Sequence, residues 1–519
     1  MRIRNSFRNI GFGLLGQLAS TVLGFIVRYL FIATLGIEYL GVSGLFSDLL
    51  MMLSLANLGF ETAVIFSLYK PLAQGDTSKV RAYMTLYGKA YRIIGLVILA
   101  AGLAVLPLLP WLIHGGTAIP HLELYYLLFL LNSVSSYFFV YKQAVIVADQ
   151  RQYIISKIHT VHIVISNAIQ IVLLVLLRNY AVVLAAQIVL GIAKNAYIAR
   201  RTDRLYPYLR EHRTANLSAE ERGQFFRNLG SLMIYKVSGV VINGTDNVII
   251  SKLFGLAWVG IYSNYYLILT TLSTFIGYIF YSVAASVGNV NAAESEEKKH
   301  EIFRVLHFAN FWVFGLSTVC LWSLINPFVS LWIGSQYVLD RWVLLAVLLN
   351  FYTTGMQNAA TTVRDASGTF RLGKYGPLAA AFLNIGVSLY LADRIGLAGV
   401  FLGTVVSRLL TFFWYDPFLL YRHVFHKKVL PYFIRSLAYG ATVLAVAFGC
   451  DLLGRLAPAE PAAELAVRAA ICLAAANAVF YALYGRTGEF AYVMGAFKRL
   501  GAGMPSLRSK RAGIGKETG

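Results

Sequence analysis

Charged residues are scarce in this sequence of 519 residues. Asp, Glu, Lys and Arg together make up 13% of the chain, whereas hydrophobic residues make up 58% and the mean hydropathy is +0.64. Soluble domains carry about a quarter charged residues, so this chain has too few charges to cover a water-exposed surface of its size. The shortage argues against a series of soluble domains and favours a membrane protein.

Cysteine and the usual catalytic motifs are also scarce. Three cysteines, Cys320, Cys450 and Cys472, lie in apolar runs without a C-x-x-C pair, and we interpret them as packing residues. The sequence has no Walker A motif and no glycine-rich phosphate loop, so we do not expect ATP hydrolysis by the chain. His159 and His162 lie three residues apart, but the other ligands of a metal site are missing. We expect no enzyme activity, metal or cofactor.

Long apolar runs are abundant instead. Runs of about 20 residues are long enough to cross a bilayer as helices. The first run is longer than the apolar part of a signal peptide and has no convincing cleavage site, so we interpret it as a membrane span. The fourteen runs cover about residues 10–35, 41–68, 83–113, 121–143, 154–177, 180–200, 229–253, 256–284, 303–326, 338–363, 375–394, 397–420, 432–453 and 464–485. The predicted fold class is an all-α integral membrane protein with about fourteen transmembrane helices.

The basic residues predict the orientation of these spans. With the N-terminus inside, 36 Lys and Arg residues fall on inside segments and only six on outside loops. Cytoplasmic segments of membrane proteins carry such an excess, so we expect a multi-pass protein with both termini in the cytoplasm. The formal net charge of +21 then lies mainly beside anionic lipid. Because the charges follow topology, we do not expect nucleic-acid binding.

An internal repeat divides the chain. The pattern FRNIG at residues 7–11 recurs as FRNLG at residues 226–230, an offset of 219, and the glycines Gly36 and Gly41 meet Gly255 and Gly260 at the same offset. Six spans separate the two copies, so both have the same orientation, as in transporters with two lobes around an axis normal to the membrane. We expect an N-terminal lobe (1–200), a basic connector (201–228), a C-terminal lobe (229–422), an appended helix pair (423–489) and a basic cytoplasmic tail (490–519).

Polar side chains inside the spans are the candidate functional residues. Such residues are costly in a membrane and persist where they face a cavity or a partner. Gln17 and Arg28 are eleven residues apart and therefore lie on one face of a helix, and the repeat places Lys236 and Asn247 at the equivalent positions. Two equivalent polar stripes predict the walls of a central cavity. The expected substrate-binding residues are Gln17, Arg28, Lys236, Asn243, Asn247 and Arg408.

Three acidic residues, Asp48, Glu61 and Asp246, are expected to form a gate or ion pairs. Asp48 and Arg28 lie about equally far from the outer turn, so a salt bridge within one lobe is an alternative to a substrate-binding Arg28. Glu61 matches the depth of Lys236 near the inner ends, and the two could close the inner side or each find a partner within its own lobe. For Arg408, bonding to backbone carbonyls is the alternative to lining the cavity.

Three segments of the first 150 residues carry a family resemblance. They are LSLANLGFETAVIFSLYKPLAQGD at residues 53–76, YGKAYRIIG at 87–95 leading to LPLLP at 106–110, and SYFFVYKQAVIVAD at 136–149. These segments resemble the Wzx-type polysaccharide repeat-unit flippases, a branch of the multidrug/oligosaccharidyl-lipid/polysaccharide exporter superfamily. The resemblance implies two six-helix lobes and alternating access. It also implies a bacterial cytoplasmic membrane, a lipid bilayer around the chain, and an undecaprenyl-pyrophosphate-linked oligosaccharide as substrate for surface polysaccharide export.

The basic excess within the spans suits this substrate, because a pyrophosphate needs cations and arginine binds phosphate in a bidentate manner. A polysaccharide polymerase or export machinery would be a further partner. Two other functions stay open. A cation-coupled multidrug efflux antiporter usually has an acid in its first helix, where this chain has Gln17 and Arg28. A membrane glycosyltransferase or polymerase would need a sizeable outside loop with acids or histidines, and none is present.

Overall fold

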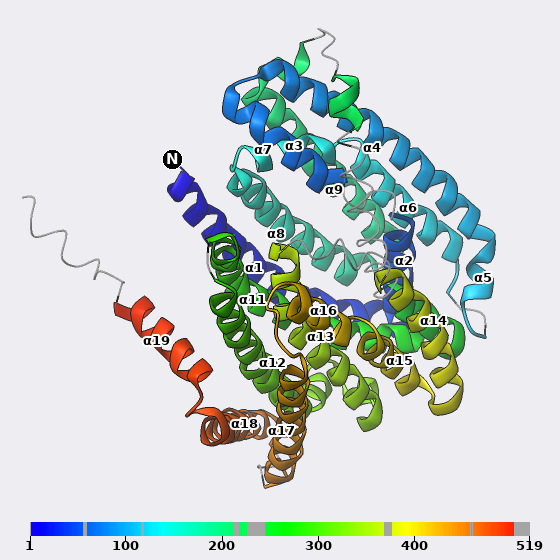
Figure 1. Ribbon diagram of the computed structural model, residues 1–519. Coiled ribbons are helices and arrows are strands. Elements are labelled where there is room, and N and C mark those ends of the chain that lie inside the picture. Colours follow the sequence, from blue (N-terminus) through cyan, green and yellow to red (C-terminus); the bar gives the residue numbers. More distant parts are fainter. Residues whose placement is uncertain are drawn as a thin grey trace, which may run out of the picture. The chain divides into compact units, whose positions relative to one another are not determined.

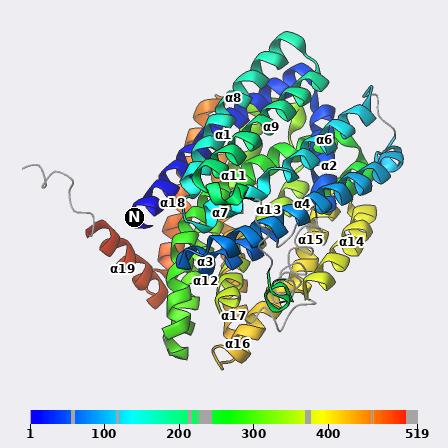
Figure 2. The same ribbon diagram turned by 90° about the horizontal axis from the view of Figure 1, so that it is seen from above.

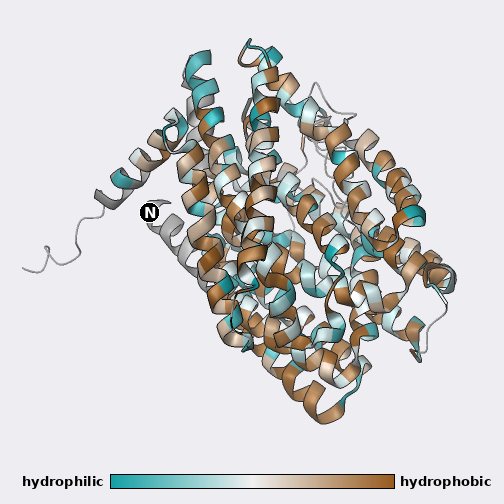
Figure 3. Cartoon of the chain, turned by 90° about the horizontal axis from the view of Figure 1, so that it is seen from below, coloured by the Kyte–Doolittle hydropathy of each residue, from teal (hydrophilic) through white to brown (hydrophobic). Residues whose placement is uncertain are grey.

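The computed structural model describes residues 2–54, 60–115, 119–211, 217–223, 225, 244–293, 295–367, 376–456, 458 and 460–502. Every regular element in these ranges is a helix, and none is a strand (Figure 1). Apolar residues occupy most turns of the long helices (Figure 3). The all-α membrane fold class is therefore confirmed.

The chain forms two compact units, and the first comprises Met1–Leu272, Trp332–Val343 and Lys374–Thr411. Its α-helices are α1 (Arg2–Leu35), α2 (Ile37–Leu53), α3 (Phe60–Gln74), α4 (Thr77–Val105), α5 (Leu109–Leu112), α6 (Leu122–Tyr137), α7 (Gln143–Ala148), α8 (Gln152–Leu177), α9 (Tyr180–Leu205), α14 (Gly376–Ile395) and α15 (Leu397–Leu410). Residues 244–254 are also helical, and the first turns of α11 (Leu256–Ala293) belong here. Short 3-10 turns are η2 (Leu106–Leu108), η3 (Val140–Lys142), η4 (Pro207–Arg210) and η5 (Ser335–Tyr337).

The second unit comprises Ser273–Leu331, Leu344–Gly373 and Phe412–Gly519. It contains most of α12 (Glu296–Ile333) and α13 (Arg341–Ser367), together with α16 (Phe412–His423), α17 (Leu430–Gly454), α18 (Pro461–Tyr484) and α19 (Gly488–Ala502). Its core joins buried side chains of α12, α13, α16 and α17, among them Phe303, Ala360, Leu420 and Tyr432. One of the basic residues that the sequence places inside pairs with an acid here: Arg364 donates to Asp416 at 2.8 Å with both side chains buried.

Thirteen of the fourteen predicted spans coincide with described helices, and the larger part of the span at 229–253 lies outside the described residues. Within the described part, nine helices are long and apolar enough to cross a membrane. The count of fourteen stays a prediction, as do the boundaries of the lobes and of the connector. The helix α19 extends into the predicted tail as far as Ala502.

The internal repeat is visible in the helix bounds. At the offset of 219 residues, three helix starts of the first copy meet three of the second: Ile37 of α2 and Leu256 of α11, Thr77 of α4 and Glu296 of α12, Leu122 of α6 and Arg341 of α13. The turns agree as well. Gly36 and Gly255 have φ of 95° and 93°, and Gly115 and Gly334 have φ of 72° and 117°. Such angles favour glycine, which explains why these glycines recur.

The two copies touch within the first unit, where α2 contacts α11. A Cβ atom at Gly41 would collide with the carbonyl oxygen of Leu256, and one at Gly260 would collide with that of Ile37. These two contacts are repeat images of each other, which is the pattern of a two-fold interface. Gly44, about one turn further along α2, lies against its own repeat equivalent, Ser263.

Around α8 the first unit is built from close helix pairs. α1 packs along α8, and α8 packs against α9, as Figure 2 also shows. Gly16 of α1 lets the two helices approach, because a Cβ atom there would meet the hydroxyl of Thr160. α8 ends at Arg178 in the left-handed conformation, and the side chain of Asn179 caps the start of α9 by accepting from the Val182 amide at 3.3 Å. This short turn aligns α8 and α9 side by side.

Candidate functional site

Four buried polar side chains of the first unit form one hydrogen-bond chain, here called the Asp246 cluster. The Thr245 hydroxyl donates to Asn384 Oδ1 at 3.1 Å, Asn384 Nδ2 donates to Thr404 Oγ1 at 2.8 Å, and the Thr404 hydroxyl donates to Asp246 Oδ1 at 3.2 Å. The residues come from helix 244–254, α14 and α15, and each is at most 5% exposed. Gly403 permits this arrangement, because a Cβ atom there would collide with the backbone of Ser388 on α14.

The Asp246 carboxylate is a charged group placed deep in a membrane domain, where charge is costly unless it is compensated. Its hydrogen-bonding neighbours are neutral hydroxyl and amide groups, while the Arg408 guanidinium and the Asp48 carboxyl are near enough to act on it electrostatically. The cluster therefore brings together the predicted residues Asp246, Asp48 and Arg408.

A second carboxylate, Asp48 on α2, accepts a hydrogen bond from Asn247 Nδ2 at 2.7 Å. The salt bridge between Arg28 and Asp48 that the sequence left open is absent from the described structure. The described carboxylate partner of Asn247 is therefore Asp48, and the equal depth of Arg28 and Asp48 stays a prediction. Gly44, one turn before Asp48 on α2, also lies on the side that faces Asn247.

Arg28 on α1 is half-buried, and among the described residues no carboxylate oxygen lies within 4.0 Å of its guanidinium. Gln17 on the same helix is also half-buried. Glu61, at the start of α3, is exposed, whereas its predicted gate partner Lys236 and the predicted substrate residue Asn243 lie outside the described residues. The structure thus places Arg28 where its charge has no acidic partner in the described part of the chain.

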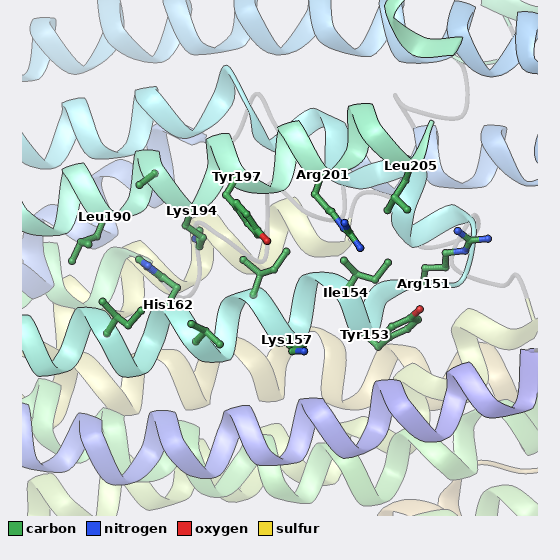
Figure 4. Close-up of a pocket in the computed structure, with 14 residues that line it drawn as sticks. Arg151, Tyr153, Ile154, Lys157, His162, Leu190, Lys194, Tyr197, Arg201 and Leu205 are labelled. Carbon is green, nitrogen blue, oxygen red and sulfur yellow. The ribbon is translucent and has the colours of Figure 1, made fainter. Parts of the chain in front are cut away.

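A long cavity between α8 and α9, here called the basic groove, has a volume of about 830 Å³. One wall is a stripe of α9 at helical spacing, with Leu190, Lys194, Tyr197, Arg201 and Leu205 (Figure 4). The facing wall is a stripe of α8, and Figure 4 shows its labelled members lying opposite those of α9. The other residues that line the groove, most of them on α8, are Arg151, Tyr153, Ile154, Lys157, Ile158, Val161, His162, Ile165 and Ala193.

The basic groove contains no carboxylate among its lining residues. Arg151 pairs with Asp149 at 2.9 Å just outside it, but Lys157, Lys194 and Arg201 have no carboxylate within 4.0 Å in the described part of the chain. Elsewhere in the same unit, the available acids are bound by other cations, as in the pairs Lys142–Asp203 at 2.7 Å, Arg210–Asp203 at 3.4 Å and Arg81–Glu211 at 2.9 Å. Three positive charges are therefore concentrated in one groove.

Sequence analysis did not single out these three cations. Lys157, Lys194 and Arg201 lie near the inner ends of predicted spans, where topology alone accounts for basic residues. A usable signal was present in the spacing, because Leu190, Lys194, Tyr197 and Arg201 recur every three or four residues and so share one helix face. The groove forms only because α8 faces α9, so the sequence of either helix alone could not predict it.

Comparison with known proteins shows similarity in structure only. No protein-family model matches the chain, and no curated protein matches it. The lipid II flippase MurJ in its inward closed conformation matches with a TM-score of 0.62 at 15% identity, over 92% of this chain and 100% of that chain. A multidrug resistance MATE family transporter of the MOP superfamily, in its inward-facing conformation, matches with a TM-score of 0.59 at 15% identity, over 77% and 94%.

A mutant of the Vibrio cholerae MATE transporter VcmN matches with a TM-score of 0.57 at 14% identity, over 82% of this chain and 99% of that chain. Identities this low establish the fold and nothing finer. The described helices are apolar and numerous enough for a chain that crosses the membrane several times. The protein is thus a multi-pass membrane protein whose fold is similar to that of MATE transporters and of the lipid II flippase MurJ.

Proposed function

We propose that this protein is a flippase that moves a lipid-linked oligosaccharide, attached through a diphosphate, across the bacterial cytoplasmic membrane for surface polysaccharide export. The observation that carries the proposal is the state of Arg28. The nearest predicted counter-ion, Asp48, bonds to Asn247 instead, and no other carboxylate of the described residues lies within 4.0 Å of the guanidinium. A half-buried cation is costly in a membrane span when its charge is not compensated, and an anionic substrate would compensate it.

The fold supports transport, and the charges support the class of substrate. Guanidinium groups bind diphosphate oxygens in a bidentate manner, which ammonium groups cannot do. We assign Arg28, Lys236 and Arg408 to the diphosphate, and Gln17, Asn243 and Asn247 to hydrogen bonds with the head group. Glu61 and Lys236 are proposed to meet when the inner side closes. An inside-negative potential favours outward movement of an anion by about 2.3 kcal/mol per charge per 100 mV.

Cation-coupled multidrug efflux is a second candidate function, and the Asp246 cluster favours it. A carboxylate surrounded by neutral oxygen donors can exchange a proton or a small cation during a transport cycle. Such a coupling site is compatible with either substrate, so it does not decide between them. The candidates differ in the charge of the cargo, because Arg28 would repel a cationic drug and attract a diphosphate.

Deletion of the gene in its host, followed by extraction of lipid-linked sugars, tests the proposed function. Loss of surface polymer together with build-up of lipid-linked repeat units on the inner leaflet is the expected result. Unchanged polymer with increased sensitivity to cationic drugs would instead support efflux and contradict the flippase.

Complementation of the deletion strain tests the role of Arg28. Arg28→Gln, which keeps much of the side-chain length and removes the charge, is expected to fail although the protein reaches the membrane in normal amounts. Because Asp48 bonds to Asn247, adding Asp48→Asn is not expected to restore export. Restoration by the double variant would mean that Arg28 serves only to neutralise Asp48, and Arg28 would then leave the proposed site.

A further inference from the structure

The basic groove between α8 and α9 combines two chemistries at different depths. Towards the inner ends of the helices it offers Arg151, Lys157 and Arg201, with Lys194 about 10 Å deeper than Arg201 along α9. Towards the membrane interior it is lined by Ile158, Val161, Ile165 and Leu190. A ligand that fills it must therefore carry negative charge at one end and an apolar chain at the other.

The groove is accessible, and its size suits a ligand. Its volume of about 830 Å³ lies within the range of about 300–1,000 Å³ that is usual for small-molecule sites. Val161 is 51% exposed, Ile165 47% and Tyr197 57%. Among the candidate spans of the described part, α8 has the smallest buried share. Apolar side chains exposed on a membrane helix are suited to contact with a hydrocarbon chain.

The charge of the groove selects among anionic lipids. A phosphodiester head group carries one negative charge, whereas Lys157, Lys194 and Arg201 supply three positive charges that no carboxylate within 4.0 Å offsets in the described structure. A diphosphate brings two or more negative charges and several acceptor oxygens, so it matches the groove more closely. Tyr197 lies between Lys194 and Arg201 on the same stripe (Figure 4), where its hydroxyl can donate to a phosphate oxygen.

We propose that the basic groove binds a lipid diphosphate, with the diphosphate between Lys194, Arg201 and Lys157 and the apolar chain along Ile158, Val161 and Ile165. The site is separate from Arg28 on α1 and serves as a docking position for the lipid anchor. It rests on the proposed function in one respect, since a lipid diphosphate is the anchor of the proposed substrate.

Binding of geranylgeranyl diphosphate to the purified full-length protein in detergent tests the proposal. A lost charge-assisted contact corresponds to about tenfold or more in Kd, so Lys194→Gln and Arg201→Gln are each expected to weaken binding about tenfold. The matched control is Arg200→Gln, because Arg200 is exposed on the same helix but is not in the groove. Wild-type affinity in both groove variants would overturn the proposal, as would an equal loss in Arg200→Gln.

Two further ligands and one blocking variant test the roles of the diphosphate and of the apolar chain separately. Phosphatidylglycerol and inorganic pyrophosphate are each expected to compete at least about tenfold less well than geranylgeranyl diphosphate. Phosphatidylglycerol lacks the diphosphate, and pyrophosphate lacks the apolar chain. Equal competition by phosphatidylglycerol would make the groove a phospholipid site, and equal competition by pyrophosphate would remove the role of the chain. Ala193→Trp fills the groove and should abolish binding, whereas Ala193→Ser should not.

The same variants distinguish this proposal from the proposed function. Suppose that Lys194→Gln binds the lipid diphosphate and flips a lipid-linked oligosaccharide as well as the wild type does. This result would refute lipid-diphosphate binding in the basic groove and would leave the proposed flippase function intact. Tight, Lys194-dependent binding in a protein that flips no such lipid would refute the flippase and retain the groove.

Discussion

Two regions of the first unit handle charge in opposite ways. In the Asp246 cluster, one carboxylate is buried beside neutral side chains that are hydrogen-bonded in series. In the basic groove, three cations lie along an open cavity without a carboxylate among the lining residues. A buried charge beside hydrogen-bonded neutral groups suits a small ligand, whereas charges along an open groove suit a large ligand that brings its own counter-charge.

The largest expected effect comes from removing the charge of the Asp246 cluster. Asp246→Asn preserves the volume and can still accept from the Thr404 hydroxyl, so folding should be little changed. The lost charge removes a contact to a coupling cation or proton and the electrostatic partner of Arg408, and transport should fall about 10–100-fold. Initial transport rates in proteoliposomes, with thermal unfolding as the control, measure this. A normal rate would show that the carboxylate is only structural.

The second effect comes from giving the basic groove the acid that it lacks. Ala193 lines the groove and is exposed, so Ala193→Glu introduces a carboxylate next to Lys194 without disturbing a packed core. The new acid should compete with the ligand phosphate and weaken binding of geranylgeranyl diphosphate about tenfold. Ala193→Gln is the matched control of nearly equal size. Similar losses in the two variants would mean that size, and not charge, governs the groove.

The third effect comes from a substitution that should disturb the packing of α2 and leave the basic groove unchanged. Gly41→Leu places a side chain against the Leu256 carbonyl, so α2 must move away from α11, at a cost of about 1–3 kcal/mol in stability. Asp48 on α2 should then lose its contact with Asn247, while the basic groove between α8 and α9 should bind its ligand normally. The control is Gly24→Leu, because nothing lies within 4 Å of a Cβ atom at Gly24 in α1. Equal unfolding temperatures for the two variants would contradict the close contact.

The smallest effect is expected at an exposed ion pair outside both regions. The Lys79 ammonium, which donates to Glu221 at 2.8 Å, and the Ser218 amide hold the pKa of Glu221 below its ordinary value. A lowered pKa means that the stabilisation is present above the carboxyl's unfolded pKa and is lost as pH falls through the folded pKa. Because the pair is exposed and screened, the effect should be slight.

Thermal unfolding of wild type and Glu221→Gln across acidic pH checks this expectation. The two unfolding temperatures should differ slightly at neutral pH and converge once Glu221 is protonated. A difference that grows with acidification would have the wrong sign for a carboxyl whose pKa is lowered.

The fold was predictable from the sequence because its main signals are long and local. Apolar runs predicted helices in the right places, and the offset of 219 found from short motifs also relates Thr77 to Glu296 at helix starts. The site was less predictable, because its contacts join distant residues. Asp246 meets Thr404 across 158 positions, and no local pattern indicates that pairing.

The sequence did not separate charged residues by their local environment, because residues with different neighbours are of the same types. Lys194 and Arg201 were counted as inside charges, although they line the basic groove. Arg364 was counted in the same way but forms a buried ion pair with Asp416. Only the packing of helices distinguishes a topological charge from a functional one.

The most direct test of the account is the rate at which proteoliposomes flip a fluorescent oligosaccharide linked to a lipid diphosphate. Wild-type protein should flip it, and Arg28→Gln, reconstituted at equal density and with the same unfolding temperature, should flip it about tenfold more slowly or worse, because the variant lacks the charge-assisted contact to the diphosphate. Equal rates for the two proteins, or a wild type that moves a cationic dye and leaves the lipid diphosphate in place, would contradict the claim that this membrane protein carries an anionic lipid-linked substrate.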